Sequence, residues 1–387
     1  SQAFGYASSA EGSASFAAGE ESVAKGNSSF SAGYRSLANT NYSIAIGDSA
    51  EALGLASISL GTYNDASGDY SFSAGRASTA GGDYSVAIGF FAKAEEFGSV
   101  AIGRNSEATS SYAYALGNLA KASGIHSFAS GYATKASGRE ATAMGNQTKA
   151  SGFYSVAIGS RTEALGNTSF AVGFNAIARS SYSAAIGRDV IAKQIYETVV
   201  GRYNDTAVGF PLIFSIGNGL SNTTRKSAFF ISKNSDNSYF NGSVYPATTG
   251  TNSLGASSVR WSALYATNGT IQTSDTTLKE NIAPLDYGLD ALMNVKTISY
   301  NWKDDKRQIR KIGFNAQNLL EVIPEVVQTH SEHQNEETGE VTYAENETLG
   351  VYYSDMIPVL TKAIQEQQAQ IEELQKQISL LLLSIED

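Results

Sequence analysis

Residues 82–103 read GDYSVAIGFFAKAEEFGSVAIG, and the alternation inside this stretch decides the fold of the first half of the chain. Within residues 85–88 the small residues Ser85 and Ala87 alternate with apolar residues, and within residues 92–95 two alanines alternate with a lysine and a glutamate. Alternation with a period of two indicates a β-strand, so the stretch predicts two short strands, each with one face of small side chains. Glycine is expected at the corners between the strands, because a positive φ is free there.

The same pattern repeats through the first half of the chain. Counting from Gly5 in steps of seven reaches Gly201, and glycine occupies 24 of the 29 positions visited. The exceptions all fall on alternate positions, so the true repeat has fourteen residues in two unlike halves. A fixed period of this kind predicts a solenoid. With fourteen or so coils that rise about 4.8 Å each, the solenoid is expected to be roughly 65 to 70 Å long.

The two strands of each coil face each other through serine and alanine, and such an interior is too thin for large side chains. This predicts a flattened β-roll. The apolar half of each repeat then forms an outer wall, which a monomer would leave in contact with water. We therefore expect the wall to pack against partner chains in a symmetric bundle around an axis. The predicted trimer-interface residues of the wall are Val86, Ile88, Val100, Ile102, Val156 and Ile158.

These repeats resemble the head of YadA-like trimeric adhesins, whose repeats are similar to the SVAIG at 85–89, 99–103 and 155–159. The resemblance covers residues 1–204. It implies a parallel left-handed β-roll in a homotrimer, with the valine and isoleucine faces of three chains packed together. After residue 204 the regular spacing stops and irregular strand-like pieces appear, as at 210–216. Residues 205–273 are interpreted as a β-rich neck or stalk connector, and a receptor pocket within it is the alternative.

Residues 274–282 read SDTTLKENI and place a lysine five positions after a serine. Such a pair can act as nucleophile and base, because an uncharged lysine amine can take the hydroxyl proton. In most chains the two residues are instead a turn residue and a solvated charge. The sequence around the pair decides between these two interpretations.

The C-terminal part of the chain, from this stretch onward, resembles the endosialidase-type intramolecular chaperone, the self-cleaving C-terminal domain of phage tail fibres and tailspikes. The motifs are SDTTLKENI at 274–282, PLDYGLDAL at 284–292, ISYNWK at 298–303, IGFNAQNLLEVIPEVV at 312–327 and LGVYYSDMIPVLTKAIQEQ at 349–367. The resemblance runs from Thr273 to the end of the chain. It implies that residues 274–356 form the small α+β auto-processing domain, with Ser274 as nucleophile, Lys279 as base and Thr273 before the scissile bond.

The lysine can approach the serine hydroxyl only if the segment between them turns back. We expect this to require folding of the domain around Leu278 and Ile282, so that cleavage occurs only after the chains have assembled. Thr276-Thr277 stands where the family more usually has a charged pair. A clamp that trimerises the chain without cleaving it therefore remains an alternative. Within the domain the sequence also predicts strands at 298–302 and 311–314 and a helix at 316–322.

Residues 357–387 predict a coiled-coil helix, because apolar residues recur at alternating steps of three and four. Isoleucine and leucine occupy both kinds of seam position, and this favours more than two strands. A trimer is again the expected state, from a signal independent of the roll. The predicted trimer-interface residues of the seam include Ile364, Ile371, Leu374, Ile378 and Leu381.

The composition of the 387 residues narrows the remaining classes of function. A net charge of -10 argues against nucleic acid as a partner. No apolar run reaches eighteen residues, so no membrane insertion is expected. With no cysteine and three histidines, no metal or other cofactor is expected. The chain begins inside a repeat, so we expect a preceding N-terminal part that attaches to tail or baseplate proteins.

The sequence thus predicts a mainly β, homotrimeric tail fibre of a virion or a contractile injection system, made in the bacterial cytoplasm, that binds a cell-surface receptor. The receptor is a glycan or a protein. The one enzymatic activity expected of this chain is autoproteolysis by the Ser-Lys pair. The alternatives are a tail fibre that degrades a polysaccharide, and a bacterial surface adhesin with a non-cleaving trimerisation domain.

Overall fold

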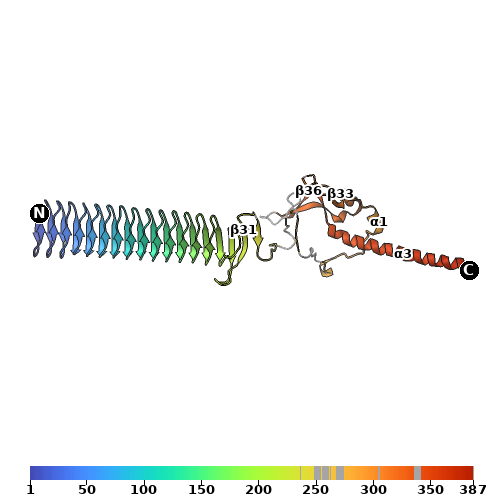
Figure 1. The fold of residues 1–387 in the computed structure, drawn as a ribbon, viewed down its shortest axis with the longest axis horizontal. Coiled ribbons are helices and arrows are strands. Elements are labelled where there is room, and N and C mark those ends of the chain that lie inside the picture. The colour runs from blue at the N-terminus through green and yellow to red at the C-terminus, as the bar shows by residue number, and fades with distance from the viewer. Residues whose placement is uncertain are drawn as a thin grey trace. The chain divides into compact units, whose positions relative to one another are not determined.

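The computed structural model describes residues 1–235, 237–247, 254, 261, 263–266, 274–303, 306–334 and 341–386. The chain divides into two compact units, Ser1–Val244 and Tyr245–Asp387. The first unit is a stack of β-strands, and the second contains the helices α1, α2 and α3 (Figure 1).

The first unit is built from two sheets whose strands alternate along the chain. The strands of the larger sheet in the roll are β1 (Gln2–Phe4), β3 (Phe16–Ala18), β5 (Phe30–Ala32), β7 (Ile44–Asp48), β9 (Ile58–Thr62), β11 (Phe72–Arg76), β13 (Val86–Phe90), β15 (Val100–Arg104), β17 (Tyr114–Asn118), β19 (Phe128–Tyr132), β21 (Thr142–Asn146), β23 (Val156–Ser160), β25 (Phe170–Phe174), β27 (Ala184–Arg188) and β29 (Thr198–Arg202). Those of the smaller sheet are β2 (Ser9–Ala10), β4 (Val23–Ala24), β6 (Leu37–Ala38), β8 (Glu51–Ala52), β10 (Asp65–Ala66), β12 (Thr79–Ala80), β14 (Lys93–Ala94), β16 (Glu107–Ala108), β18 (Lys121–Ala122), β20 (Lys135–Ala136), β22 (Lys149–Ala150), β24 (Glu163–Ala164), β26 (Ile177–Ala178) and β28 (Ile191–Ala192).

Each strand of the roll pairs in parallel with the strand fourteen residues further on. In the larger sheet Val86 is aligned with Val100, and in the smaller sheet Lys93 is aligned with Glu107. Equivalent positions of successive repeats therefore form rows along the stack of strands (Figure 1). The predicted parallel β-roll with a fourteen-residue repeat is confirmed.

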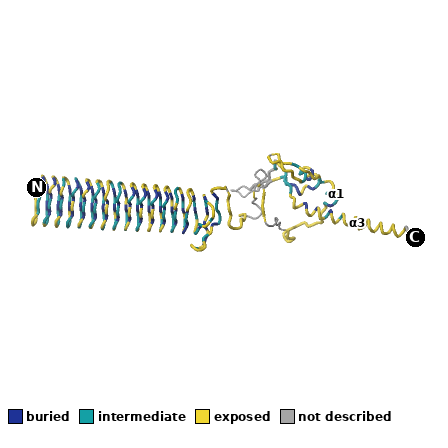
Figure 2. The backbone as a smooth tube through the Cα atoms, in the orientation of Figure 1, coloured by how far each residue is buried: buried dark blue, intermediate teal, exposed yellow. Residues whose placement is uncertain are grey.

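The interior of the roll consists of small side chains. Ser85, Ala87 and Ala94 have no exposed surface, and the same holds for the equivalent alanines of most coils. Figure 2 shows these buried positions recurring along the roll. Backbone hydrogen bonds between coils, such as that from Val86 N–H to the carbonyl oxygen of Ser99 at 2.9 Å, pair the backbone polar groups that this packing buries.

The apolar wall points away from this interior. Val86 and Ile88 are half-buried, and Ile102 and Ile158 are 39% and 36% exposed in the single chain. The strand period of two forces this result, because the alanine between two apolar residues must face the opposite way. The wall lies entirely on the larger sheet.

The corners of the roll are formed by residues other than the ladder glycines. The residue two positions after a ladder position has a left-handed φ, such as 57° at Tyr84 and 55° at Phe91. The ladder glycines therefore do not form the corners as predicted, although those of the larger sheet have the expected positive φ. Gly89 does have a φ of 141°, but it lies within β13. Glycine is required there because the coils stack closely: a Cβ on Gly89 would lie 2.2 Å from the carbonyl oxygen of Gly103.

The larger sheet continues beyond the repeats. β30 (Leu212–Asn218) pairs in parallel with β29, and Thr198 is aligned with Phe214, sixteen residues on instead of fourteen. β31 (Ser227–Ser232) and β32 (Ser238–Phe240) then add antiparallel strands. The part of the predicted neck up to Val244 thus belongs to the same compact unit as the roll.

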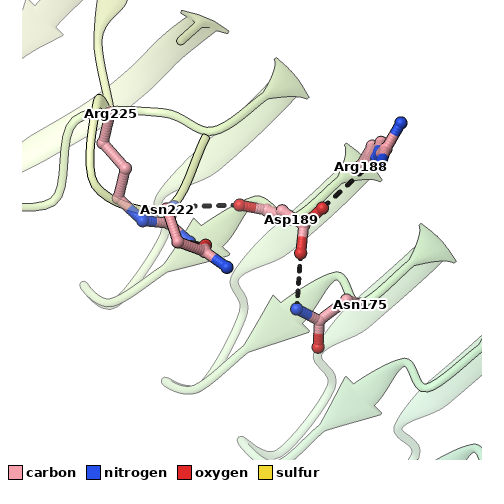
Figure 3. Close-up of polar contacts among 5 residues, drawn as sticks. All are labelled: Asn175, Arg188, Asp189, Asn222 and Arg225. Carbon is pink, nitrogen blue, oxygen red and sulfur yellow. Dashed lines mark hydrogen bonds and ion pairs between the residues drawn. The ribbon is translucent and has the colours of Figure 1, made fainter. Parts of the chain in front are cut away.

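The loop between β30 and β31 closes the last coils of the roll. Arg225 Nη1 donates to the carbonyl oxygen of Asp189 at 2.9 Å, and Arg225 Nη2 donates to Asn222 Oδ1 at 2.6 Å (Figure 3). The Asp189 carboxylate, in a residue only 5% exposed, accepts hydrogen bonds from Asn175 Nδ2 at 2.6 Å and Arg188 Nε at 3.4 Å. These contacts supply partners for polar groups that the end of a solenoid would leave unpaired.

The second unit gathers short elements around one apolar cluster. Its elements are the 3-10 helix η1 (Thr276–Leu278), α1 (Leu289–Met293), β33 (Thr297–Tyr300), β34 (Lys311–Phe314), α2 (Ala316–Val322), the 3-10 helix η2 (Pro324–Val326), β35 (Val327–Gln334), β36 (Val341–Val351), the 3-10 helix η3 (Tyr353–Asp355) and α3 (Met356–Glu386). The antiparallel pair β33–β34 and helix α2 match the expected elements, whereas the hairpin β35–β36 is not predicted by the sequence. The buried cluster consists of Leu319, Ile323, Val326, Val327, Met356 and Val359.

Helix α3 has two apolar faces. One face, with Met356, Val359 and Ala363, is at most 2% exposed. The predicted seam is instead 42% to 64% exposed, and it comprises Ile364, Ile371, Leu374, Ile378 and Leu381. The N-terminal part of α3 thus completes the core of its own unit while the seam stays accessible. No helix among the described residues has the length and apolarity needed to cross a membrane.

Candidate functional site

The side chains of the predicted nucleophile and base meet in the structure. Lys279 Nζ donates a hydrogen bond to Ser274 Oγ at 2.8 Å. The two residues are joined by the 3-10 helix η1, which reverses the chain within one turn. The backbone N–H of Lys279 donates to the carbonyl oxygen of Thr276 at 3.2 Å and ends this turn. The predicted turning back of the segment is thus a local feature of residues 274–279.

Asp275 is the residue that starts this turn. Its carboxylate accepts hydrogen bonds from the backbone N–H of Thr277 at 2.9 Å and from Thr277 Oγ1 at 2.8 Å. The backbone hydrogen bond, followed by the hydroxyl, lowers the pKa of Asp275, because both stabilise the ionised carboxylate. Asp275 therefore acts as an N-cap of the turn that carries Lys279 toward Ser274.

The surroundings of the pair differ from the sequence-based expectation. Ser274 and Lys279 are exposed, and Leu278 and Ile282, around which the domain was expected to fold, are 74% and 66% exposed. That expectation is wrong for the single chain. The buried cluster of this unit is built by α2, η2, β35 and α3, and it does not include residues 274–282.

Thr273, the residue predicted to precede the scissile bond, lies outside the described residues. The site's described part is therefore the nucleophile, the base and the turn that joins them. In this arrangement the serine hydroxyl already accepts a hydrogen bond from the amine that would take its proton. A nucleophile and base within this distance are what covalent catalysis requires.

The segment after the site is anchored to the core at two points. The Tyr287 hydroxyl donates to Glu325 Oε1 at 3.1 Å, and this hydrogen bond raises the pKa of Tyr287. Two residues later, the backbone N–H of Leu289 donates to Glu366 Oε2, on α3, at 2.7 Å. Both anchors come from residues far away in sequence, so the sequence pattern contained no signal for them.

Two residues of this unit that cap a turn or a helix were also missed by reasoning from the sequence. Asn315 caps α2 by accepting a hydrogen bond from Asn318 N–H at 3.0 Å. Asp275 could have been found, because an aspartate two positions before a threonine is a usual cap of a turn. Within the described part of the chain, no group of three or more histidine, aspartate or glutamate side chains is placed to hold a metal ion.

Comparison with known families finds two matches. The family described as "YadA head domain repeat (2 copies)" matches residues 24–50, 41–64, 66–92, 80–106, 108–134, 136–162 and 164–189. The description "Chaperone of endosialidase" matches residues 274–328, so it begins at Ser274 and ends within β35. The rest of the hairpin and α3 lie beyond this second match. No curated protein matches the chain in sequence.

Proposed function

We propose that the chain forms a homotrimeric attachment fibre whose C-terminal domain assembles the trimer and then removes itself by cleavage before Ser274. The proposal starts from the order of the two family matches, in which YadA head repeats are followed by a chaperone-of-endosialidase domain. The two matches support the general conclusion that the chain is an adhesin-like or tail-fibre-like protein with a chaperone domain. The trimer, the cleavage and the attachment are the proposal.

The observation that carries the proposal is the 2.8 Å hydrogen bond between Lys279 Nζ and Ser274 Oγ. In the proposed reaction, Lys279 as the neutral amine takes the hydroxyl proton while Oγ attacks the carbonyl carbon of Thr273. The resulting ammonium returns this proton to the Ser274 nitrogen as the Thr273–Ser274 peptide bond breaks. This shift leaves an ester on Oγ, which water hydrolyses to a Thr273 carboxylate. Proximity supplies much of the acceleration, because the hydroxyl belongs to the residue whose amide bond breaks.

Assembly is proposed as the trigger because the single chain leaves the site open. A lysine acts as a base most readily when it is removed from water, yet Lys279 is exposed here. Leu278 and Ile282 add exposed apolar surface immediately beside the pair. A partner chain that covers these two side chains would bury apolar area and remove water from the amine at the same time.

Two further surfaces support a trimer. The apolar wall of the roll forms continuous rows on one sheet, and the seam of α3 forms another exposed apolar line. Both would remain in contact with water in a monomer. After cleavage the fibre would lack the domain that assembled it. Its three chains could then not easily come apart and assemble again, so the fibre would be kinetically stable. The proposed location is an extracellular particle, such as a virion tail or injection system, or a cell surface.

The proposal is tested by mass spectrometry of freshly expressed protein, separated into monomeric and trimeric fractions. Denatured protein from the trimeric fraction is expected to contain a fragment of residues 274–387 with Ser274 at its N-terminus, and the monomeric fraction only the intact chain. A trimer that remains intact after prolonged incubation would contradict the cleavage. An assembly other than a trimer would contradict the proposed architecture.

A further inference from the structure

Three lysines form an unbroken row on the smaller sheet of the roll. Lys121 of β18 is aligned with Lys135 of β20, and Lys135 is aligned with Lys149 of β22. All three are exposed. Adjacent strands in a sheet are about 4.8 Å apart, so this lysine row (Lys121, Lys135 and Lys149) places three positive charges on one line parallel to the roll axis.

At the equivalent positions of the other strands of the smaller sheet, no three lysines stand side by side. Lys93 is aligned with Thr79 on one side and Glu107 on the other. Glu107 forms an ion pair with Lys121 at 2.5 Å. In the described part of the chain, neither Lys135 nor Lys149 lies within ion-pair distance of an acidic side chain, although Lys149 is aligned with Glu163 on its other side. Lys135 has a lysine on either side. Like charges directly opposite each other in a sheet are destabilising, so the positive charge at the centre of the row is uncompensated.

The row lies in the one part of the roll that has a positive charge. Residues 117–204 contain nine lysines and arginines and four acids, which gives +5, whereas residues 1–116 contain five and eleven, which gives -6. The whole chain has a net charge of -10. A local excess of positive charge on a negatively charged chain concentrates anions at that place.

The neighbouring positions make this face polar and rigid. Two residues after each lysine stand Ser123, Ser137 and Ser151, which are half-buried. Between them, Ala122, Ala136 and Ala150 have no exposed surface and hold the backbone against the roll interior. The lysine side chains are thus spaced by a rigid ladder, so little backbone order must be gained when a ligand binds.

The apolar wall does not compete for this face. The wall lies on the larger sheet and the lysine row on the smaller one. In the proposed trimer, in which the walls pack together, the three copies of the row would remain accessible to a ligand. Three equivalent rows would also strengthen binding to a multivalent surface through effective concentration.

We propose that the lysine row binds an anionic polysaccharide that lies along the roll axis, with its carboxylate or sulfate groups against the ammonium groups. This inference rests on the proposed attachment function and names the class of its ligand. The coil spacing is close to the length of one sugar unit in an extended polysaccharide, and the serine hydroxyls supply hydrogen-bonding partners for sugar hydroxyls. A single-stranded nucleic acid is disfavoured, because its bases stack on aromatic side chains, whereas the lysine row and the serines beside it contain none.

The test measures binding of the trimeric protein to alginate oligomers, a polyuronate, by calorimetry at low and physiological salt. Neutral dextran and oligothymidine are the comparison ligands. Binding to alginate is expected to weaken as salt increases, and the double variant Lys135→Gln/Lys149→Gln is expected to bind about tenfold more weakly with a smaller salt dependence, because two ionic contacts are lost. The variant Lys93→Gln is the matched control, since this exposed lysine lies in the same row of positions but has no lysine on either side, and its affinity is expected to stay within about twofold of the wild type.

The double variant Lys135→Arg/Lys149→Arg is expected to keep the affinity, which separates charge from loss of folding. Equal binding by the wild type and the glutamine variant would overturn the inference, as would dextran binding as tightly as alginate. Tighter binding of oligothymidine than of alginate would assign the row to nucleic acid and overturn it too. Trimer formation and cleavage are measured on the same preparations. A trimer that cleaves itself and attaches to cells but does not bind alginate would refute this inference alone and leave the proposed function standing.

Discussion

Lys279 Nζ and Ser274 Oγ lie 2.8 Å apart although both residues are exposed. Their contact results from the five-residue spacing and from a single turn that Asp275 caps, and it does not depend on the core of the unit. The geometry of the pair is therefore local, whereas exclusion of water from it has to come from elsewhere. Substitutions in the turn and substitutions at the chain–chain surfaces should consequently affect cleavage in different ways.

Replacing either member of the pair is expected to stop cleavage. Ser274→Ala removes the nucleophile and Lys279→Ala removes the base, and neither side chain contributes to the buried cluster. Both variants are therefore expected to form trimers that stay full length on a denaturing gel while wild-type trimers are cut. Cleavage of Ser274→Ala at the same bond would show that another group attacks.

The cap of the turn is expected to set the rate of cleavage. Asp275→Ala removes the acceptor for Thr277 N–H and Oγ1, so the turn opens more often and cleavage slows several-fold. Asp275→Asn is the matched control, because asparagine caps nearly as well as aspartate. An Asp275→Ala variant that cleaves at the wild-type rate would show that the trimer, and not the cap, holds the turn.

The same residue predicts a pH dependence. The pKa of Asp275 is lowered in the folded chain by its hydrogen bonds to Thr277. Its contribution is therefore fully present above the ordinary aspartate value of about 3.9 and is lost as the pH falls through the lowered folded value. Hydrogen exchange of the Thr277 amide in the Ser274→Ala variant is expected to be slow at pH 5 and to lose its protection only below the ordinary aspartate pKa. The same loss should be absent when Asp275→Asn is added to that variant.

Charges on the apolar wall are expected to prevent assembly. Val86, Val100 and Val156 each replaced by Asp would bury unpaired charges between chains, at a cost of about 3 to 5 kcal/mol per site. Native mass spectrometry should then show monomers. Lys93, Lys121 and Lys135 replaced by Asp lie on the opposite sheet and should leave the trimer intact. If both triple variants still form trimers, the interface between the chains does not lie on the apolar wall.

The seam of α3 is expected to control cleavage through assembly. Ile371→Ser/Ile378→Ser removes two exposed seam side chains and should slow both trimer formation and cleavage to the same extent. Leu380→Ser/Leu382→Ser changes two leucines that are similarly exposed but off the seam, and it should change neither rate. Normal cleavage in a seam variant that stays monomeric, as measured by light scattering, would uncouple cleavage from assembly.

The contacts of Arg225 are expected to stabilise the end of the roll. Arg225→Ala leaves the carbonyl oxygens of Asp189 and Asn204 without their guanidinium donor, at a cost of about 1 to 3 kcal/mol. Hydrogen exchange should then increase in the last coils, near residues 189–204, and stay unchanged near residues 82–103. Arg202→Ala, at an exposed arginine at the end of β29, should have little effect, and equal exchange in both variants would show that Arg225 is not a cap.

The sequence by itself determined the features of this protein that repeat or are local. The interior of serine and alanine and the outward wall of Val86 and Ile88 result from alternation along a strand, which local sterics enforce. The period of fourteen follows from the spacing of the ladder glycines. The parallel pairing was implied by the resemblance to YadA-like heads, and the structure confirms it. The contact of Lys279 with Ser274 belongs to the same class, because a short turn brings two residues five positions apart together whatever the rest of the chain does.

Only the tertiary structure decided the features that depend on contacts between distant residues. The ladder glycine at Gly89 is required by the adjacent coil, because a Cβ there would meet the carbonyl oxygen of Gly103, as well as by its own positive φ. The exposure of Leu278 results from a core that α2, β35 and α3 build without it. Glu366 reaches Leu289 across 77 residues. Such contacts form because the folded chain brings distant segments together, and no periodicity in the sequence records which of them will meet.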